Sequence, residues 1–280
     1  MCKKIFLRVL LVLILLFVPL IVSVEAQLEN SSQKNHPIEN LVGEKLYYDV
    51  SFLWFKRLAE GSISLQRAEQ PGTYLAVMQA RTLGMAAFFT RNRIEKYQTL
   101  LEIGPTGLLR PLLHSSHTFK GSGDQQREKR TTYRFDFSAR QVHYKKVKNG
   151  RVDADELLSL ETDGPVFDIL SAFYNLRIES FGKIAHRKIV LPTFHRKGVE
   201  EIVVAPVEKL SSSEQKFFAD TTLLFKVLVD PSVFKTKGRD LYVGFDEKNR
   251  LEKGIIKNVI GLGDVKGVLR HDLSFFPPED

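Results

Sequence analysis

Cysteine is almost absent from this 280-residue sequence. The one cysteine, Cys2, lies in the charged N-terminal segment. The rest of the chain can form no disulfide, no thiolate metal site and no cysteine nucleophile. It also lacks the acceptor cysteine that follows the apolar run of a lipoprotein leader. Stability must therefore come from a buried core, and a chain of this length buries about 70–75% of its unfolded surface.

Signatures of catalysis are lacking as well. No nucleophile elbow is present, and the glycine-rich stretch Gly261–Gly267 has neither the spacing of a dinucleotide loop nor a βαβ unit around it. The acids Asp49, Asp136 and Asp168 are each isolated from another acid in the sequence, so they indicate no catalytic pair. We expect no catalytic residues and no cofactor, and we keep an enzyme only as a third hypothesis.

Histidines occur in one suggestive spacing, the HxxH pair formed by His114 and His117. The pair lies in a strand-like run, where residues three apart point to opposite faces. We therefore predict two unrelated surface or edge histidines. The remaining histidines have no local partner that would suggest zinc, so we expect no metal site.

The N-terminus has the layout of a secretory leader. Its apolar segment, Val9–Val22, has 14 residues, which is short of the roughly 20 residues of a membrane span. Small or modest side chains at Val24–Ala26 precede the expected cleavage point. We predict a signal peptide over residues 1–26 and a periplasmic or secreted protein, with an uncleaved N-terminal anchor as the alternative.

Charge is moderately positive after the leader is removed. The basic count falls from 41 to 38 and the acidic count from 33 to 32, which leaves a net charge of +6. Such a surface can serve solubility alone, or it can bind an anionic surface such as phospholipid head groups or envelope polysaccharide. Nucleic acid is not expected as a partner, because no recognition motif is present.

The pattern of apolar residues predicts a mainly β fold. Residues 27–41 are polar and read as a disordered spacer, and a single domain is expected over residues 42–276. Apolar and polar side chains alternate from Leu46 to Trp54, as in a strand. Later segments repeat this pattern over residues 74–82, 93–103, 108–120, 129–137, 142–147, 188–191, 199–207, 222–229, 240–245, 250–259 and 264–275.

One segment departs from the alternation. From Pro165 to about Glu179 the apolar residues recur at spacings of three, four and seven, which indicates an amphipathic helix, with Asp163 as a plausible N-cap. Antiparallel hairpins fit the rest, including a type I′ turn at Asn149–Gly150. The fold class we expect is a strongly curved antiparallel sheet or barrel with the helix of residues 165–179 packed on it.

Three stretches of the chain carry a family resemblance. They are Val42–Phe52 with the following Ala59–Gly61, the helical block Asp168–Arg177, and the last three strands, which end in Gly261–Leu269. Together they resemble an uncharacterised family of bacterial exported proteins, domain of unknown function 3108, over nearly all of Val42–Phe275. The resemblance implies an exported β protein and supplies no catalytic residues.

Two features stand out as candidate binding elements. Leu83–Phe89 is an apolar stretch between strands, which either packs on the core or forms the lip of an apolar pocket or a membrane-touching patch. The hairpin of residues 127–151 carries nine basic residues against Glu128 and Asp136. It is either a solvated face that protects a strand edge or an anionic docking surface.

These features lead to two hypotheses of different class. In the first, a non-catalytic, lipid-binding envelope protein holds an apolar or anionic amphipathic ligand, with the membrane only as a transient surface contact. The residues that we expect to bind it are Trp54, Phe88, Phe89, Lys145 and Lys146. In the second, a structural or assembly factor recognises an envelope protein or polysaccharide through edge strands or the basic hairpin 127–151.

Overall fold

The computed structural model of the protein describes residues 36–52, 55–121, 123–162, 164–182 and 187–271. Its contacts divide the chain into two compact units, Met1–Val42 and Gly43–Asp280. In the first unit, Pro37–Leu41 form a 3₁₀-helix (η1), and the ring of the N-cap residue His36 accepts a hydrogen bond from the backbone N–H of Ile38 at 3.3 Å. The spacer expected over residues 27–41 therefore contains this helix within its described part.

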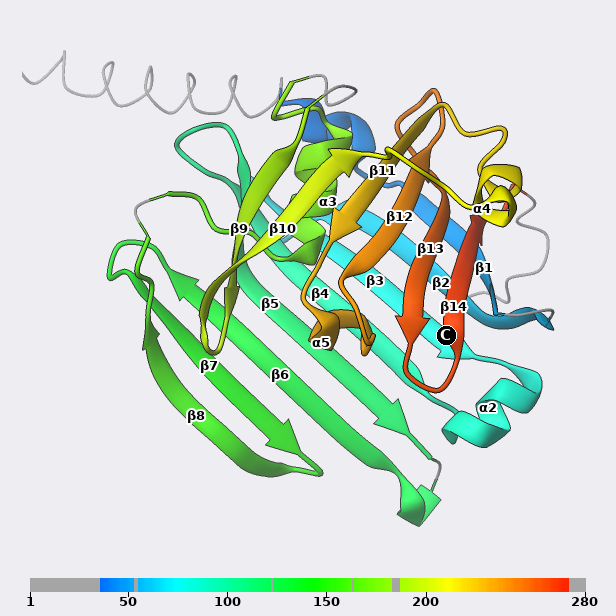
Figure 1. The fold of residues 1–280 in the computed structure, drawn as a ribbon. Helices are drawn as coiled ribbons and strands as arrows, with labels where there is room; N and C mark the ends of the chain where they lie inside the picture. The colour runs from blue at the N-terminus through cyan, green and yellow to red at the C-terminus, as the bar shows by residue number, and fades with distance from the viewer. Residues whose placement is uncertain (1–35, 53–54, 122, 163, 183–186, 272–280) are drawn as a thin grey trace, which may run out of the picture. The chain divides into compact units, whose positions relative to one another are not determined.

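The second unit contains one antiparallel sheet of fourteen strands (Figure 1). Across the sheet the order is β8-β7-β6-β5-β4-β3-β2-β1-β14-β13-β12-β11-β10-β9, so the sheet is open and β8 and β9 are its edges. The strands are β1 (Lys45–Phe52), β2 (Phe55–Arg67), β3 (Thr73–Thr82), β4 (Ile94–Ile103), β5 (Leu109–Lys120), β6 (Arg127–Asp136), β7 (Gln141–Lys148), β8 (Arg151–Ser159), β9 (Ile189–His195), β10 (Gly198–Pro206), β11 (Leu223–Leu228), β12 (Asp240–Phe245), β13 (Leu251–Val259) and β14 (Gly263–Leu269).

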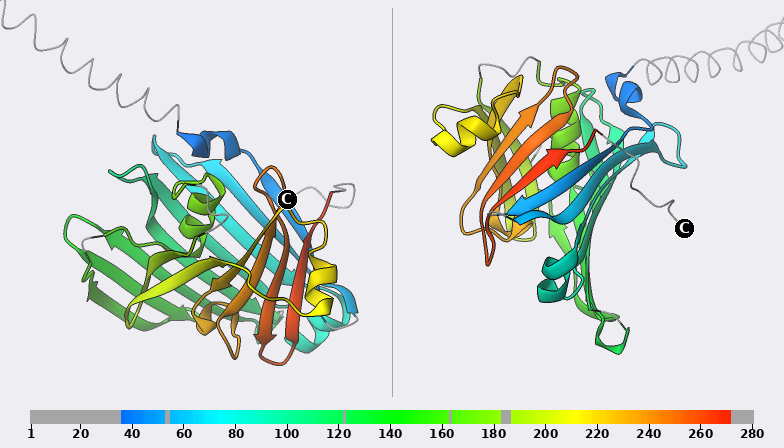
Figure 2. Two further views of the ribbon diagram at one scale, coloured as in Figure 1. Left: turned by 45° about the horizontal axis from the view of Figure 1, so that its top comes forward. Right: turned by 90° about the vertical axis from the view of Figure 1, so that its right-hand side faces the viewer.

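The predicted class, mainly β with a strongly curved antiparallel sheet, is confirmed, and the sheet is curved without closing. The part of the sheet formed by β9–β14 folds back over the part formed by β2–β6 (Figure 2). The turn at Asn149–Gly150 is also confirmed, since both residues have the positive φ angles, 48° and 76°, that a type I′ turn requires.

Four short helices and one 3₁₀ turn connect the strands of this unit. They are α2 (Gly84–Thr90), α3 (Ile169–Arg177), α4 (Ser212–Phe217), α5 (Pro231–Phe234) and η2 (Gly123–Gln125). None of the helices in the described ranges is long and apolar enough to cross a membrane.

The start of α3 corrects the sequence prediction. The helix begins at Ile169 with Asp168 as N-cap, and not at Pro165. Val166 and Phe167 are buried, and the N–H of Phe167 donates to the carbonyl of Pro192 at 2.8 Å, so this stretch runs extended beside β9. The helical spacing of its apolar residues was therefore misleading. Asp163, the expected N-cap, lies outside the described residues.

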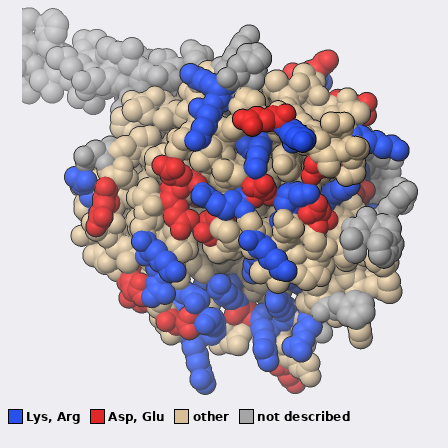
Figure 3. Space-filling model, viewed as in Figure 1, with Lys and Arg blue, Asp and Glu red and all other residues tan. Residues whose placement is uncertain are grey.

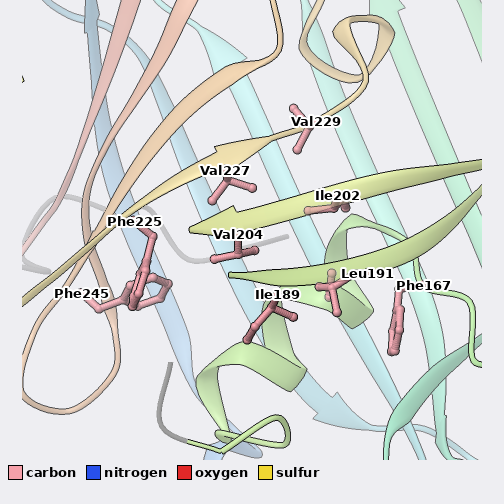
Figure 4. Packing of buried hydrophobic residues seen from close by; sticks show 10 residues of the cluster. Phe167, Ile189, Leu191, Ile202, Val204, Phe225, Val227, Val229 and Phe245 are labelled. Atoms are coloured by element: carbon pink, nitrogen blue, oxygen red, sulfur yellow. The ribbon is translucent and has the colours of Figure 1, made fainter. Parts of the chain in front are cut away.

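The hydrophobic core lies around α3. Side chains from β9, β10, β11 and β12 pack with Phe167 and Ala172, and Phe173 and Leu176 of α3 join them at the periphery (Figure 4). Each fully buried aliphatic or aromatic side chain of this kind stabilises the fold by about 1.5–3 kcal/mol. The helix is thus enclosed between the two parts of the sheet, and this is why its buried residues include polar ones.

The curved sheet has an inner face and an outer face. The inner face packs on α3 and carries one row of directly paired residues on successive strands, namely Leu65, Ala76, Thr99, His114, Tyr133, Tyr144 and Glu156. The outer face carries the alternate residues. Because side chains alternate along a strand, adjacent residues within a strand belong to different faces.

Candidate functional site

The N-terminus of α3 is fixed to the inner face by a buried polar cluster. Asp168 caps the helix, since its Oδ1 accepts the N–H of Ser171 at 2.7 Å and the Ser171 hydroxyl oxygen accepts the N–H of Asp168 at 2.8 Å. Its Oδ2 accepts a hydrogen bond from the hydroxyl of Thr99 and lies 2.5 Å from Nδ1 of His114. Burial alone would raise the pKa of Asp168, but the nearby His114 and the hydrogen bonds outweigh it and lower this pKa.

His114 therefore departs from its predicted place. The two histidines of the HxxH pair do face opposite sides of the sheet, as predicted, and His117 lies 2.6 Å from Glu128 on the outer face. However, the side chains of His114 and His117 are only 13% and 15% exposed and β5 is not an edge strand, so neither is a surface or edge residue, and His114 belongs to the Asp168 cluster. Among the described residues no group of three or more His, Cys, Asp or Glu side chains could hold a metal ion.

The rest of α3 is fixed by two further polar contacts. The Asn175 amide pairs with the backbone of Leu109, accepting its N–H at 2.9 Å and donating to its carbonyl at 2.7 Å. Arg177, whose side chain is 1% exposed, forms an ion pair with Glu44 and donates to the carbonyl of Asn249 at 2.8 Å. The block that carries the family resemblance is thus the helix that anchors the core.

A small cavity lies beside the anchored helix. The cavity beside α3, lined by Leu176, Val204 and Phe225 among others, has a volume of about 30 Å³. That is room for about one water molecule. This cavity is too small for an apolar ligand of the kind proposed from the sequence.

Toward the sheet edge the inner face becomes aromatic and then charged. The rings of Tyr133 and Tyr144 lie 5.0 Å apart, and burial raises the pKa of Tyr133 to about 12. Arg196, between β9 and β10, lies over the Tyr144 ring at 5.3 Å and donates to Glu156 of β8 at 2.9 Å. The β9–β10 hairpin therefore contacts the opposite edge of the sheet without pairing with it.

At the ends of β5, β6 and β7 the inner face carries a group of cations that we call the lysine cluster (Figure 3). Lys129 and Lys148 are directly opposite each other on β6 and β7, and Lys146 is two residues before Lys148 on the same face. Cross-strand neighbours of this kind have Cβ atoms about 4.5–5.5 Å apart. The remaining members are Lys120, at the end of β5, and Lys235, which follows α5.

The acids near the lysine cluster are too few to neutralise it. Asp153 pairs with Lys146 at 2.6 Å and with Lys148 at 3.0 Å, and Glu95 pairs with Lys235 at 2.7 Å. Glu95 also pairs with Arg93, just before the start of β4. The cluster therefore holds a surplus of positive charge.

Two members of the lysine cluster have no carboxylate within ion-pair distance in the described ranges, namely Lys120 and Lys129. Burial lowers the pKa of Lys129, and the charges of Lys146, Lys235 and Lys148 lower it further. The pKa of Lys120 is lowered in the same way, by burial and then by the neighbouring cations. Like charges held together destabilise the free protein, and an anion placed among them would relieve the repulsion.

An exposed apolar helix lies beside these cations. In α2 the residues Met85 and Phe88 are 61% and 80% exposed, so these two residues of the apolar stretch are not buried in the core. The C-cap residue of α2, Arg91, accepts a backbone hydrogen bond from Gly121, next to Lys120. The helix projects on the side of the sheet where β9–β14 lie (Figure 2).

The predicted site residues are only partly brought together. Trp54 and the side chain of Phe89 lie outside the described part of the chain, whereas Phe88 is exposed on α2. Lys146 belongs to the lysine cluster. Lys145 points to the outer face, where it pairs with Asp155 at 2.9 Å.

Sequence reasoning missed Lys120 and Lys235 as partners of the basic hairpin. Lys235 is more than a hundred residues from Lys129, and no local signal links the two. The strand period would have separated Lys145 from Lys146, because neighbours in a strand face opposite ways.

Comparison with known proteins gives one match. The model of a family described as "Protein of unknown function (DUF3108)" matches residues 47–270. No curated protein and no solved structure matches the chain.

Proposed function

The chain belongs to the DUF3108 family of proteins of unknown function, and we propose that this member is an exported, non-catalytic protein that binds anionic amphipathic ligands of the cell envelope. The lysine cluster would meet the anionic head group, and the exposed side chains of α2 would contact the apolar part. The observation that carries the proposal is the surplus of lysines that converge on the inner face from β5, β6, β7 and α5.

The chemistry of the lysine cluster fits phosphate-bearing head groups. Lysine ammonium groups are compact point charges on flexible stems, suited to anions that present oxygens in several directions. Each basic residue near an anionic lipid surface contributes about 1 kcal/mol to binding. Exposed Met85 and Phe88 beside the cations add apolar contact, so that a head group and the start of its chains can be bound together.

Co-sedimentation with lipid vesicles tests the proposal. We expect the protein to bind vesicles of phosphatidylcholine mixed with phosphatidylglycerol and not vesicles of phosphatidylcholine alone. The double variant Lys129→Ala/Lys146→Ala should bind the anionic vesicles about 30-fold more weakly, since two contributions of about 1 kcal/mol are lost. The same affinities measured with monomeric dodecyl phosphate would show whether a single phosphate amphiphile binds without a bilayer.

A matched control is available on the same strand. Lys145→Ala removes the same charge from β7 and also breaks one surface ion pair, but it acts on the outer face. We expect its vesicle binding to stay close to that of the unchanged protein. If Lys145→Ala weakened binding as much as the double variant, general charge and not the lysine cluster would be responsible, and the proposal would fail.

Export is the second part of the proposal, and it rests on the leader pattern of residues 1–26. The protein produced in a bacterial host should appear in the periplasm or the medium. Intact mass measurement should show the loss of the segment that ends at Ala26. Recovery of the full-length chain from the membrane fraction would favour the uncleaved anchor, and recovery from the cytoplasm would contradict export.

An assembly role is the second candidate, because β8 is an edge strand of nine residues. It exposes Val152 and Leu157, with side chains 57% and 64% exposed, and such an edge can accept another strand. However, Asp153 and Asp155 of β8 form ion pairs with lysines of β7. Charged side chains of this kind are common on edge strands that do not accept a further strand. The variant Ala154→Pro tests this role. If it no longer captured one envelope protein but still bound vesicles, the assembly role would be favoured.

A further inference from the structure

A groove on the outer face of the sheet has a different chemistry from the lysine cluster. Its volume is about 920 Å³, and its floor is formed by Leu75, Leu100 and Leu113. These leucines are directly paired neighbours on β3, β4 and β5. All three are half-buried, and in adjacent register they form a contiguous apolar strip on the outer face.

The shape of the groove follows from the strands that form it. The register of β4 and β5 shifts between Leu100 and Leu101, so an extra residue of β5, Leu112, interrupts the ladder. A bulge of this kind bends the strand and increases its twist, which hollows the outer surface locally. The turn between β2 and β3 forms one wall of the groove.

Three arginines (Arg67, Arg110 and Arg134) and three acids (Glu69, Glu102 and Asp136) line the groove around its apolar floor. The Arg110 guanidinium lies 4.1 Å from the centre of the Phe137 ring and pairs with Glu102 at 2.6 Å. This stacked pair also lines a second cavity of about 340 Å³, so it separates the two spaces. Arg134, directly opposite Leu113 on β6, has no acid partner among the residues that the structure describes.

We propose that this outer groove is a second binding site, independent of the lysine cluster, for a small amphiphile with one carboxylate. The apolar body lies on the three leucines, and the carboxylate pairs with Arg134. Arginine presents two parallel N–H donors that match a carboxylate, whereas the lysines of the inner face suit phosphates. The volume lies within the range of about 300–1,000 Å³ that is typical of small-molecule sites.

Calorimetric titration with dodecanoate tests this site, with dodecanol as the uncharged probe. For dodecanoate we expect Arg134→Gln to weaken binding about tenfold or more, because a charge-assisted pair worth about 1.5–3 kcal/mol is lost. Dodecanol should bind both proteins equally. Leu100→Asn should weaken the binding of both probes. Leu157 is an outer-face leucine on β8 outside the groove, so Leu157→Asn should weaken the binding of neither probe.

The lysine variants separate this inference from the proposed function. Lys129→Ala/Lys146→Ala should leave dodecanoate binding unchanged, and Arg134→Gln should leave vesicle binding unchanged. The inference is overturned if dodecanoate binds Arg134→Gln and Leu100→Asn as well as it binds the unchanged protein. It is equally overturned if Lys129→Ala/Lys146→Ala weakens dodecanoate binding, because the ligand would then bind at the inner face.

Discussion

Asp168 holds α3 to the sheet, and replacing it is the most informative perturbation of the fold. Asp168→Asn keeps a side chain that caps helices well but removes the negative charge. Hydrogen bonds to a charged group contribute about 1.5–3 kcal/mol and neutral ones about 0.5–1.5 kcal/mol. Because two such contacts are weakened, those with Thr99 and His114, we expect a loss of about 2 kcal/mol in the free energy of unfolding.

Asp168→Ala should cost more. Besides the loss of about 2 kcal/mol given above, it removes the cap, worth about 1 kcal/mol, and leaves buried groups unpaired at about 1–3 kcal/mol, so we expect a loss of about 4–6 kcal/mol in total. Urea unfolding followed by circular dichroism measures both losses at neutral pH. The dependence of the free energy on urea concentration should stay the same, because the surface exposed on unfolding does not change.

The pH dependence gives a second readout of the same contact. The folded-state pKa of Asp168 is lowered, so its contribution is fully present above the unfolded-state pKa of about 3.9 and is lost as pH falls through the folded value. The stability difference between the unchanged protein and Asp168→Asn should therefore shrink below about pH 4. Equal stabilities at neutral pH, or a difference that is constant in acid, would refute the reasoning.

Four further substitutions test other contacts by urea and thermal unfolding. Lys129→Gln should stabilise the free protein by about 0.5 kcal/mol, because it removes a like-charge pair across strands, and a lower melting temperature would contradict this. Arg177→Met should cost about 3 kcal/mol by leaving Glu44 unpaired, with part of the loss recovered by adding Glu44→Gln; no recovery would argue against the pair. Tyr174→Phe should leave the free energy of unfolding unchanged or slightly raise it, since the buried Tyr174 hydroxyl has no partner in the described ranges. Tyr48→Phe removes a 2.9 Å hydrogen bond to the Leu251 carbonyl and should lower the free energy of unfolding by about 1 kcal/mol.

Local pattern in the sequence was enough to predict most of the sheet. The alternation of side chains identified β3, β4, β5 and their neighbours to within a few residues, and Asn149–Gly150 identified the hairpin between β7 and β8. These signals work because the period of two and the left-handed turn conformations are local properties of the backbone. The prediction failed at Val166 and Phe167, where contact with β9 holds an extended chain in a segment of helical spacing.

The candidate sites depend on contacts that no local pattern carries. Lys235 meets the hairpin lysines only because the sheet folds back on itself, and this curvature is a property of all fourteen strands together. Likewise, His114 is buried through its contact with Asp168, the N-cap of a helix more than fifty residues later in the chain. In contrast, the separation of Lys145 from Lys146 followed from the strand period alone.

The central claim is that amphiphiles with phosphate-bearing head groups bind at the lysine cluster, and hydrogen–deuterium exchange with and without phosphatidylglycerol-containing vesicles tests it most directly. We predict that the vesicles slow exchange in residues 84–93, 118–130, 145–151 and 231–237, which form the cluster and α2, and leave the β2–β3 turn at residues 68–72 unchanged. Unchanged exchange in all four segments under conditions where the protein sediments with the vesicles would contradict the claim.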